Sequence, residues 1–173
     1  MIEAISNRLA VKMKEINPEE TASVEVMSYA LQGILHNLIT LITAIIVGSV
    51  LGQFWETLLA AACVAVLRWF SGGLHFKSAL SCFLTSASVF IVIPLIEVSD
   101  QILLITNIVS LLLVAIFAPS NIRGHIRIPE KYFPLYKLAS IIIVSINFFI
   151  LTPIITIAFF VQSCTTITFK KEV

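Results

Sequence analysis

Long, almost uninterrupted apolar runs are the feature that most restricts how this chain can fold. Of its 173 residues, 58% are hydrophobic and only 12% are charged, and the mean hydropathy is +1.02. A helix needs about 20 apolar residues to cross the roughly 30 Å of hydrocarbon in a lipid bilayer. We therefore predict an all-α, polytopic membrane protein, with residues 1–173 forming a single membrane-embedded domain.

Residues 1–18 predict an amphipathic helix at the membrane interface. Charged residues interrupt this stretch, which therefore lacks the apolar core of about 7–15 residues that a cleavable signal peptide requires. Apolar residues spaced three and four apart share one helical face. They are Ile2, Ile5, Leu9, Met13 and Ile16. Proline at position 18 ends the helix because it cannot continue the hydrogen-bond ladder. Such a helix suits the boundary between headgroups and acyl chains, and packing against the rest of the chain is the alternative.

About six membrane segments are expected within residues 27–169. The first four lie near residues 27–51, 54–70, 78–98 and 102–118. The apolar block 138–169 is too long for a single crossing, which takes about 20 residues. Pro153 would either divide this block into two short segments or kink one long tilted helix, which membrane proteins tolerate.

The positions of the 11 Lys and Arg residues favour six crossings with both termini in the cytoplasm. Short cytoplasmic loops are enriched in these residues, and the connections at 51–54 and 97–100 contain none. Six crossings put all 11 on one side, whereas five crossings would place Lys170 and Lys171 on the other. This topology puts residues 68–82, called the central stretch below, at the cytoplasmic face.

The central stretch combines a thiol and an imidazole, the smallest pair of side chains that can act as nucleophile and base. In one continuous helix His75 and Cys82 would lie about 10 Å apart along the axis, too far for a hydrogen bond of about 3 Å. Glycine adopts backbone angles that other residues avoid. A turn at Gly72 and Gly73 would therefore bring the histidine back onto the helix that bears Cys82.

The same residues also have a purely structural interpretation. A cysteine in a membrane helix often acts as a small apolar packing residue, and Arg68 can extend its guanidinium to the headgroups. At a cytoplasmic face Cys82 would be a free thiol, because that compartment is reducing. An odd number of cysteines, three in all, also cannot pair completely.

Other polar residues add little chemistry of their own. Two ligands are too few for zinc, and His125 is distant in sequence from His75 and Cys82, so we expect neither a metal nor another cofactor. His36 and Asn37 interrupt the first apolar segment and should face the interior of the helix bundle, where polar residues commonly link membrane helices.

The pattern Arg-x4-Gly-x-His-x6-Cys, formed by Arg68, Gly73, His75 and Cys82, resembles that of the accessory gene regulator protein B (AgrB) family. These are bacterial membrane endopeptidases that process quorum-sensing propeptides. The resemblance covers the whole chain, including a basic loop that follows Ala-Pro-Ser at 118–120. It implies that His75 and Cys82 are the catalytic pair, and that Arg68 supports the site together with Gly72 and Gly73.

The resemblance also implies a reaction and its partners. Cys82 would cleave a small AgrD-like propeptide and hold it as an acyl-enzyme, and a thiol or hydroxyl within the peptide would then close a thiolactone or lactone ring. The implied setting is the bacterial cell membrane, with the lipid bilayer and a second copy of the chain as partners and no nucleic acid. The family loop is typically lysine-rich, whereas the basic residues here are spread out, so specific substrate contacts are not carried over. They are Arg123, Arg127, Lys131 and Lys137.

Two other classes of function are compatible with this composition. A small transporter or peptide exporter would line a path with intramembrane polar groups, but the chain has few of these and no evident internal repeat. A non-catalytic membrane partner of a sensor kinase would not need Cys82. Replacement of Cys82 or His75 separates both from a peptidase, which alone would lose cleavage.

Overall fold

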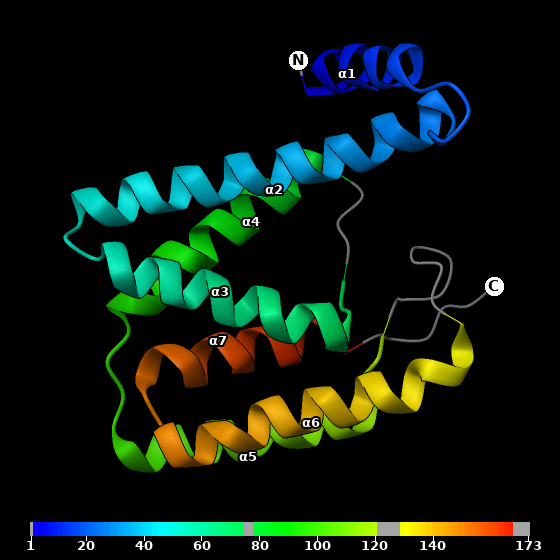
Figure 1. The fold of residues 1–173 in the computed structure, drawn as a ribbon. Coiled ribbons are helices and arrows are strands. Elements are labelled where there is room, and N and C mark those ends of the chain that lie inside the picture. Colours follow the sequence, from blue (N-terminus) through cyan, green and yellow to red (C-terminus); the bar gives the residue numbers. More distant parts are fainter. Residues whose placement is uncertain (1, 75–77, 121–128, 168–173) are drawn as a thin grey trace.

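The computed structural model describes residues 2–74, 78–120 and 129–167, and this part of the chain is helical (Figure 1). The helices are α1 (Ile2–Ile16), α2 (Val24–Val50), α3 (Phe54–Ser71), α4 (Ala79–Val92), α5 (Asp100–Phe117), α6 (Phe133–Ile150) and α7 (Pro153–Cys164), with short 3-10 turns η1 (Ile93–Leu95) and η2 (Glu130–Tyr132). Among these residues the one β-bridge is an isolated pair between Gly72 and Ser120. The all-α prediction is confirmed.

Four of these helices, α2, α3, α5 and α6, are long and apolar enough to cross a membrane. The other two apolar helices, α7 and the combined stretch Ala79–Leu95, are shorter. The six together match the positions of the six predicted segments. At 27 residues α2 is the longest, and at a rise of about 1.5 Å per residue it exceeds the hydrocarbon thickness by roughly 10 Å.

The apolar block near the C-terminus is divided into two helices rather than kinked. Helix α6 ends at Leu151, which adopts the left-handed conformation with φ 46° and ψ 44°. Pro153 is the first residue of α7, a position where its missing N–H leaves no hydrogen bond unmade. The two alternatives for Pro153 are thereby resolved in favour of the break.

Helix α7 is short but central. It packs against α3 and α5 and lies between α3 and the α5–α6 pair (Figure 1). Its Phe159 joins Leu67, Val114 and Val144 in one buried apolar cluster. A second cluster joins Ala158 and Ile157 of α7 to α3 and η1. A helix of 12 residues spans about 18 Å, and its burial by longer neighbours explains how it can remain short.

A buried amide pair links the three C-terminal helices. Asn147 of α6 donates from Nδ2 to Asn107 Oδ1 of α5 and to Thr156 Oγ1 of α7, both at 2.9 Å. All three residues are at most 1% exposed. These hydrogen bonds satisfy part of the polar groups that would be costly in an apolar environment, since Asn107 Nδ2 and Asn147 Oδ1 have no hydrogen-bond partner. The two asparagines therefore act in helix packing.

Helix α1 packs on the first half of α2 (Figure 1), with Ser6 and Ala10 fully buried at the contact. The predicted apolar face lies mainly outside this contact: Ile5, Leu9, Met13 and Ile16 are exposed. The helix therefore contacts the chain through small residues and leaves an apolar face uncovered, and its position at the membrane interface stays a prediction.

One expectation for α2 is wrong. Asn37 is exposed, whereas His36 is half-buried. Adjacent residues on a helix point about 100° apart, so both cannot face the same neighbours. The buried side of α2 follows Thr40, Ala44 and Gly48 instead.

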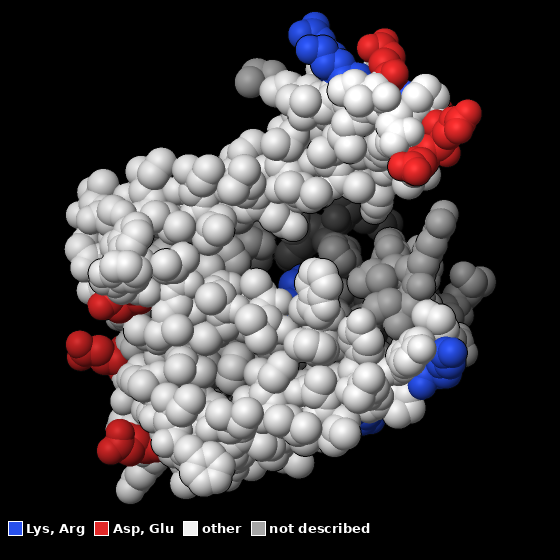
Figure 2. Space-filling model, viewed as in Figure 1, with Lys and Arg blue, Asp and Glu red and all other residues white. Residues whose placement is uncertain are grey.

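Acidic side chains mark one end of the bundle. Figure 2 shows them along the edge where Figure 1 places the α2–α3 turn and the start of α5, and further acidic side chains lie near basic ones around α1. Glu56 and Asp100 lie in the first turns of α3 and α5, whereas Arg68 lies in the last turn of α3. Lys131 precedes α6 in the η2 turn. Arg68 and Lys131 thus lie away from the α2–α3 turn, and which end faces the cytoplasm stays a prediction.

Candidate functional site

The central stretch begins with the predicted turn. Helix α3 ends at Ser71, and the chain turns at Gly72 and Gly73, whose φ angles are 67° and 138°. These angles are readily adopted by glycine and avoided by residues with a side chain. A Cβ atom at Gly73 would lie 2.5 Å from Thr165 Oγ1. Both the backbone conformation and the limited space around the Cα atom therefore favour glycine at position 73.

Segments distant in sequence hold this turn through backbone hydrogen bonds. Ser120, which follows a cis peptide bond between Ala118 and Pro119, lies between α5 and α6. Its N–H donates to the Ser71 carbonyl at 3.0 Å, and its carbonyl accepts from the Gly73 N–H at 3.1 Å. The Leu74 N–H donates to the Thr165 carbonyl at 2.9 Å. Residues just after α5 and just after α7 thus fix the path of the chain after α3.

Gln162, on the last turn of α7, adds side-chain contacts to the same turn. Its Nε2 donates to Ser71 Oγ at 3.1 Å and to the Gly72 carbonyl at 2.7 Å. The residue is 1% exposed. We call the group formed by Ser120, Gln162 and Thr165 the turn cradle, because each contacts the Ser71–Leu74 segment.

Arg68 holds the chain where it leaves the turn. Its Nη2 donates to the Leu74 carbonyl at 2.6 Å. The side chain is half-buried, so this arginine is bonded within the protein and does not extend to the headgroups, which was the alternative. Its guanidinium also lies within electrostatic range of Cys82.

Cys82 lies in the first turn and a half of α4. Its N–H donates to the Ser78 carbonyl at 3.1 Å, the side chain is half-buried, and the thiol is free, as are those of Cys63 and Cys164. The first N–H groups of a helix have no partner within it, and together with the helix dipole they favour negative charge. This position can stabilise both a thiolate and the oxyanion formed when a thiolate attacks a carbonyl.

His75, the predicted base, lies outside the described residues, as do His125, Arg123 and Arg127. Its pairing with Cys82 therefore stays a prediction. The last described residue before His75 is Leu74, which is hydrogen-bonded through both its N–H and its carbonyl.

Within the described residues, no group of three His, Cys, Asp or Glu side chains could hold a metal ion.

Sequence reasoning missed the turn cradle. Gln162 could have been noticed, because it is an amide within the apolar run that became α7, and a polar group in such a helix normally has a partner. Ser120 belongs to the Ala-Pro-Ser sequence already identified, but no sequence signal pointed from it to the glycines. Nothing in the sequence around Thr165 indicated a role for this residue.

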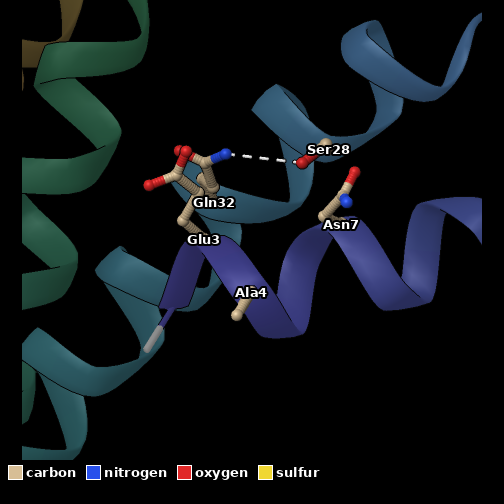
Figure 3. Close-up of a pocket in the computed structure, with 5 residues that line it drawn as sticks. All are labelled: Glu3, Ala4, Asn7, Ser28 and Gln32. Atoms are coloured by element: carbon tan, nitrogen blue, oxygen red, sulfur yellow. Dashed lines mark hydrogen bonds between the residues drawn. The ribbon is translucent and has the colours of Figure 1, made fainter.

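A polar cleft lies apart from these residues, between α1 and α2 (Figure 3). Its volume is about 500 Å³, and it is lined by Glu3, Ala4, Asn7, Ser28 and Gln32. Gln32 Nε2 donates to Ser28 Oγ at 3.4 Å across one turn of α2. None of the predicted site residues lines this cleft.

The fold and the central stretch define a class: an all-α membrane protein with an arginine bonded to a glycine turn and a free thiol near the start of the next helix. Comparison with known proteins identifies the family. The model of the accessory gene regulator B family matches residues 2–169. The chain belongs to this family, as the Arg-Gly-His-Cys pattern indicated, and membership supports a role in the processing of quorum-sensing peptides.

Two curated relatives give the extent of the similarity. A putative AgrB-like protein of Halalkalibacterium halodurans is 37% identical over 86 residues, a match that covers 50% of this chain and 44% of that relative. The accessory gene regulator protein B of Staphylococcus saprophyticus is 26% identical over 134 residues, which are 75% of this chain and 70% of the relative. No solved structure matches the chain.

Proposed function

We propose that this protein is a membrane cysteine endopeptidase that cleaves a small propeptide at the cytoplasmic membrane face and cyclises the product. Family membership supports the substrate class. The observation that carries the chemistry is the position of Arg68, which bonds to the Leu74 carbonyl immediately before His75 and lies within electrostatic range of Cys82. One fixed positive charge thus lies beside the turn that leads to His75 and near Cys82.

Cleavage begins with transfer of the Cys82 proton to the His75 imidazole. The thiolate sulfur attacks the scissile carbonyl carbon, and the resulting oxyanion is stabilised by N–H groups at the start of α4. The carbon–nitrogen bond then breaks, and the imidazolium returns its proton to the amine of the departing tail. The remaining peptide is held on Cys82 as a thioester.

Cyclisation resolves this thioester without water. A thiol or hydroxyl within the bound peptide attacks the thioester carbonyl, its proton passes to the imidazole, and Cys82 leaves and is protonated again. The product is a thiolactone or lactone with one water fewer than the linear peptide. Exclusion of water from the site favours this outcome over hydrolysis.

The charge distribution supports a cytoplasmic site in a multi-pass protein. Arg68 lies in the last turn of α3, and Lys131 and Lys137 lie just before and near the start of α6. Glu56 and Asp100 lie in the first turns of α3 and α5. Under the positive-inside rule the basic end faces the cytoplasm. A propeptide with an acidic tail would be attracted to this end.

The remaining partners are the bilayer and a second copy of the chain. The long apolar helices expose many large hydrophobic side chains, among them Ile46, Ile105, Ile116 and Phe149. Exposed apolar area of this kind suits lipid and helix–helix association in the membrane. We propose that the protein works as a homodimer in the bacterial cell membrane.

The proposal is tested by co-expression with a propeptide gene and mass spectrometry of the secreted peptide. Wild type should yield a cyclic product, whereas Cys82→Ser and His75→Ala should yield none while inserting normally. Cys63→Ala and Cys164→Ala are matched controls, because they remove free thiols from other apolar helices, and both should process the propeptide. Processing by Cys82→Ala at the wild-type rate would refute the peptidase and favour an exporter or a non-catalytic partner.

A further inference from the structure

We infer that Gln162 is a positioning residue for the proposed peptidase, one that fixes the glycine turn leading into His75. The inference rests on the proposed function and extends it to a residue that lies on α7, far along the chain from the Arg-Gly-His-Cys pattern. Four features of the described structure carry it: the burial of Gln162, the direction of its hydrogen bonds, the conformation of the glycines and the contacts of Arg68.

The burial of Gln162 requires an explanation. The residue is 1% exposed and lies in a helix that is otherwise packed by apolar and small side chains. Moving an amide from water into such surroundings without hydrogen bonds is unfavourable. A methionine of similar length would fill the space without this cost, so packing alone does not account for a glutamine.

Both hydrogen bonds from Nε2 go to the end of α3. One acceptor is Ser71 Oγ and the other is the Gly72 carbonyl, which are 91 and 90 residues away in sequence. Neither acceptor belongs to α7, and neither bond is needed to complete its helix. The amide therefore acts on the glycine turn rather than on its own helix.

The turn contains two consecutive glycines, whose backbone has wide conformational freedom to restrain. Here both glycines have positive φ angles. Gln162 fixes the direction of the Gly72 carbonyl, and a Cβ atom at Gly73 would lie 3.2 Å from Gln162 Nε2 and 3.3 Å from Arg68 Nη1. Gln162 and Arg68 thus border the same glycine from two different helices.

These contacts give Gln162 an indirect role in the reaction. It bonds to Ser71 and Gly72, and the chain reaches His75 three residues after Gly72. If the turn relaxes, the base proposed at residue 75 loses its alignment with Cys82. Misplacement of a reacting group by about 1 Å can reduce a rate about 100-fold, whereas propeptide binding elsewhere on the protein would be unaffected.

The decisive variant is Gln162→Met, which keeps the length of the side chain and removes the N–H donors. It would be reconstituted in vesicles with the propeptide, and kcat and KM would be measured separately. A second readout is the rate at which iodoacetamide alkylates Cys82 at pH 7, in a Cys63→Ala, Cys164→Ala background. We expect kcat to fall about 100-fold with little change in KM, and alkylation to slow towards the rate of His75→Ala.

Thr156→Val is the matched control. Thr156 is buried on the same helix, and in this variant it loses its hydrogen bond from Asn147 of α6, which is not a bond to the turn. It should retain wild-type kcat and Cys82 alkylation per inserted molecule. If Gln162→Met behaves in the same way, Gln162 is a packing residue and the inference is wrong.

Ser71→Ala provides a second route should Gln162→Met fail to insert. It removes one acceptor of the same amide, together with the hydrogen bond that the Ser71 hydroxyl donates to the Gly72 carbonyl, and leaves α7 unchanged. We expect a smaller reduction in kcat together with slower alkylation of Cys82. Unchanged kcat and alkylation in Ser71→Ala would then overturn the inference. Where both variants insert, their effects should be less than additive, because both remove the hydrogen bond between Gln162 Nε2 and Ser71 Oγ.

The two proposals fail in different ways. If Cys82→Ala cleaves as well as wild type, the peptidase itself is refuted. If Cys82→Ala is inactive while Gln162→Met and Ser71→Ala keep wild-type kcat and alkylation, only the positioning role is refuted. The alkylation assay does not depend on cleavage and reports on Cys82 in either case.

Discussion

The Arg68 guanidinium donates from Nη2 to the Leu74 carbonyl at 2.6 Å. One side chain near the end of α3 thus holds the chain where it leaves the glycine turn. Arginine suits this task because its planar guanidinium presents donors in several fixed directions. A lysine has one compact ammonium group on a flexible stem and cannot reproduce this geometry.

Arg68→Lys should therefore impair the proposed peptidase although the charge is kept. We expect kcat to fall about 10- to 100-fold, as for other losses of alignment, with little change in KM. Steady-state kinetics on reconstituted protein would measure this. Lys131→Arg is the control, because it exchanges the same two residue types at an exposed position, and it should leave kcat and KM unchanged. Wild-type kcat in Arg68→Lys would show that the bond to Leu74 is dispensable.

Gly73→Ala should inactivate and destabilise the protein. The backbone at φ 138° is unfavourable for alanine, and the new Cβ would lie 2.5 Å from Thr165 Oγ1. Backbone strain of this kind costs about 1–3 kcal/mol. Thermal unfolding in detergent and propeptide cleavage would be measured together.

Gly33→Ala is the comparison for this variant. Gly33 lies within α2, and a Cβ atom added there would meet nothing within 4 Å. Alanine is also the better helix former by about 1 kcal/mol. The variant should leave activity intact and maintain or raise stability. Equal behaviour of the two alanine variants would contradict the described turn.

Asn147→Leu should lower stability but not catalysis. It leaves the Asn107 and Thr156 side chains without their hydrogen bonds from Asn147. Side-chain hydrogen bonds between membrane helices contribute about 1–2 kcal/mol. Replacing Asn107 by Leu as well should recover part of the loss, because removal of both partners leaves fewer orphaned groups. Unfolding in mixed micelles would measure stability, and kcat per folded molecule would measure catalysis. A double variant less stable than Asn147→Leu would contradict the hydrogen bond between the two asparagines.

The proposed topology predicts opposite labelling at the two ends of the bundle. Glu97 and Lys131 are both exposed, the first before α5 and the second before α6. In a cysteine-free background, a membrane-impermeant maleimide should label Glu97→Cys in intact cells and Lys131→Cys only after permeabilisation. Labelling of both, or of Lys131→Cys alone, in intact cells would refute the orientation.

Sequence alone was sufficient for the local features of this protein. Apolar run length determined where the six apolar helices lie, because the bilayer demands about 20 apolar residues per crossing. Pro153 marked the place where the last apolar block is interrupted, since proline has no N–H to continue a helix, and the structure then decided between a break and a kink. The glycine pair marked the turn after α3, because few other residues adopt its backbone angles. Each of these is encoded within a few neighbouring residues.

Tertiary structure alone decided which distant residues meet. The side of α2 that is buried depends on α1, α3 and α4 packing against it, so Asn37 is exposed although its polarity predicted the opposite. In the same way, nothing near Gln162 in sequence indicates that its amide reaches Ser71 and Gly72. Hydropathy indicates which segments form apolar helices, whereas the partners of each helix follow from the packing of all helices together. For that reason the Arg-Gly-His-Cys pattern could be recognised in the sequence, and the turn cradle could not.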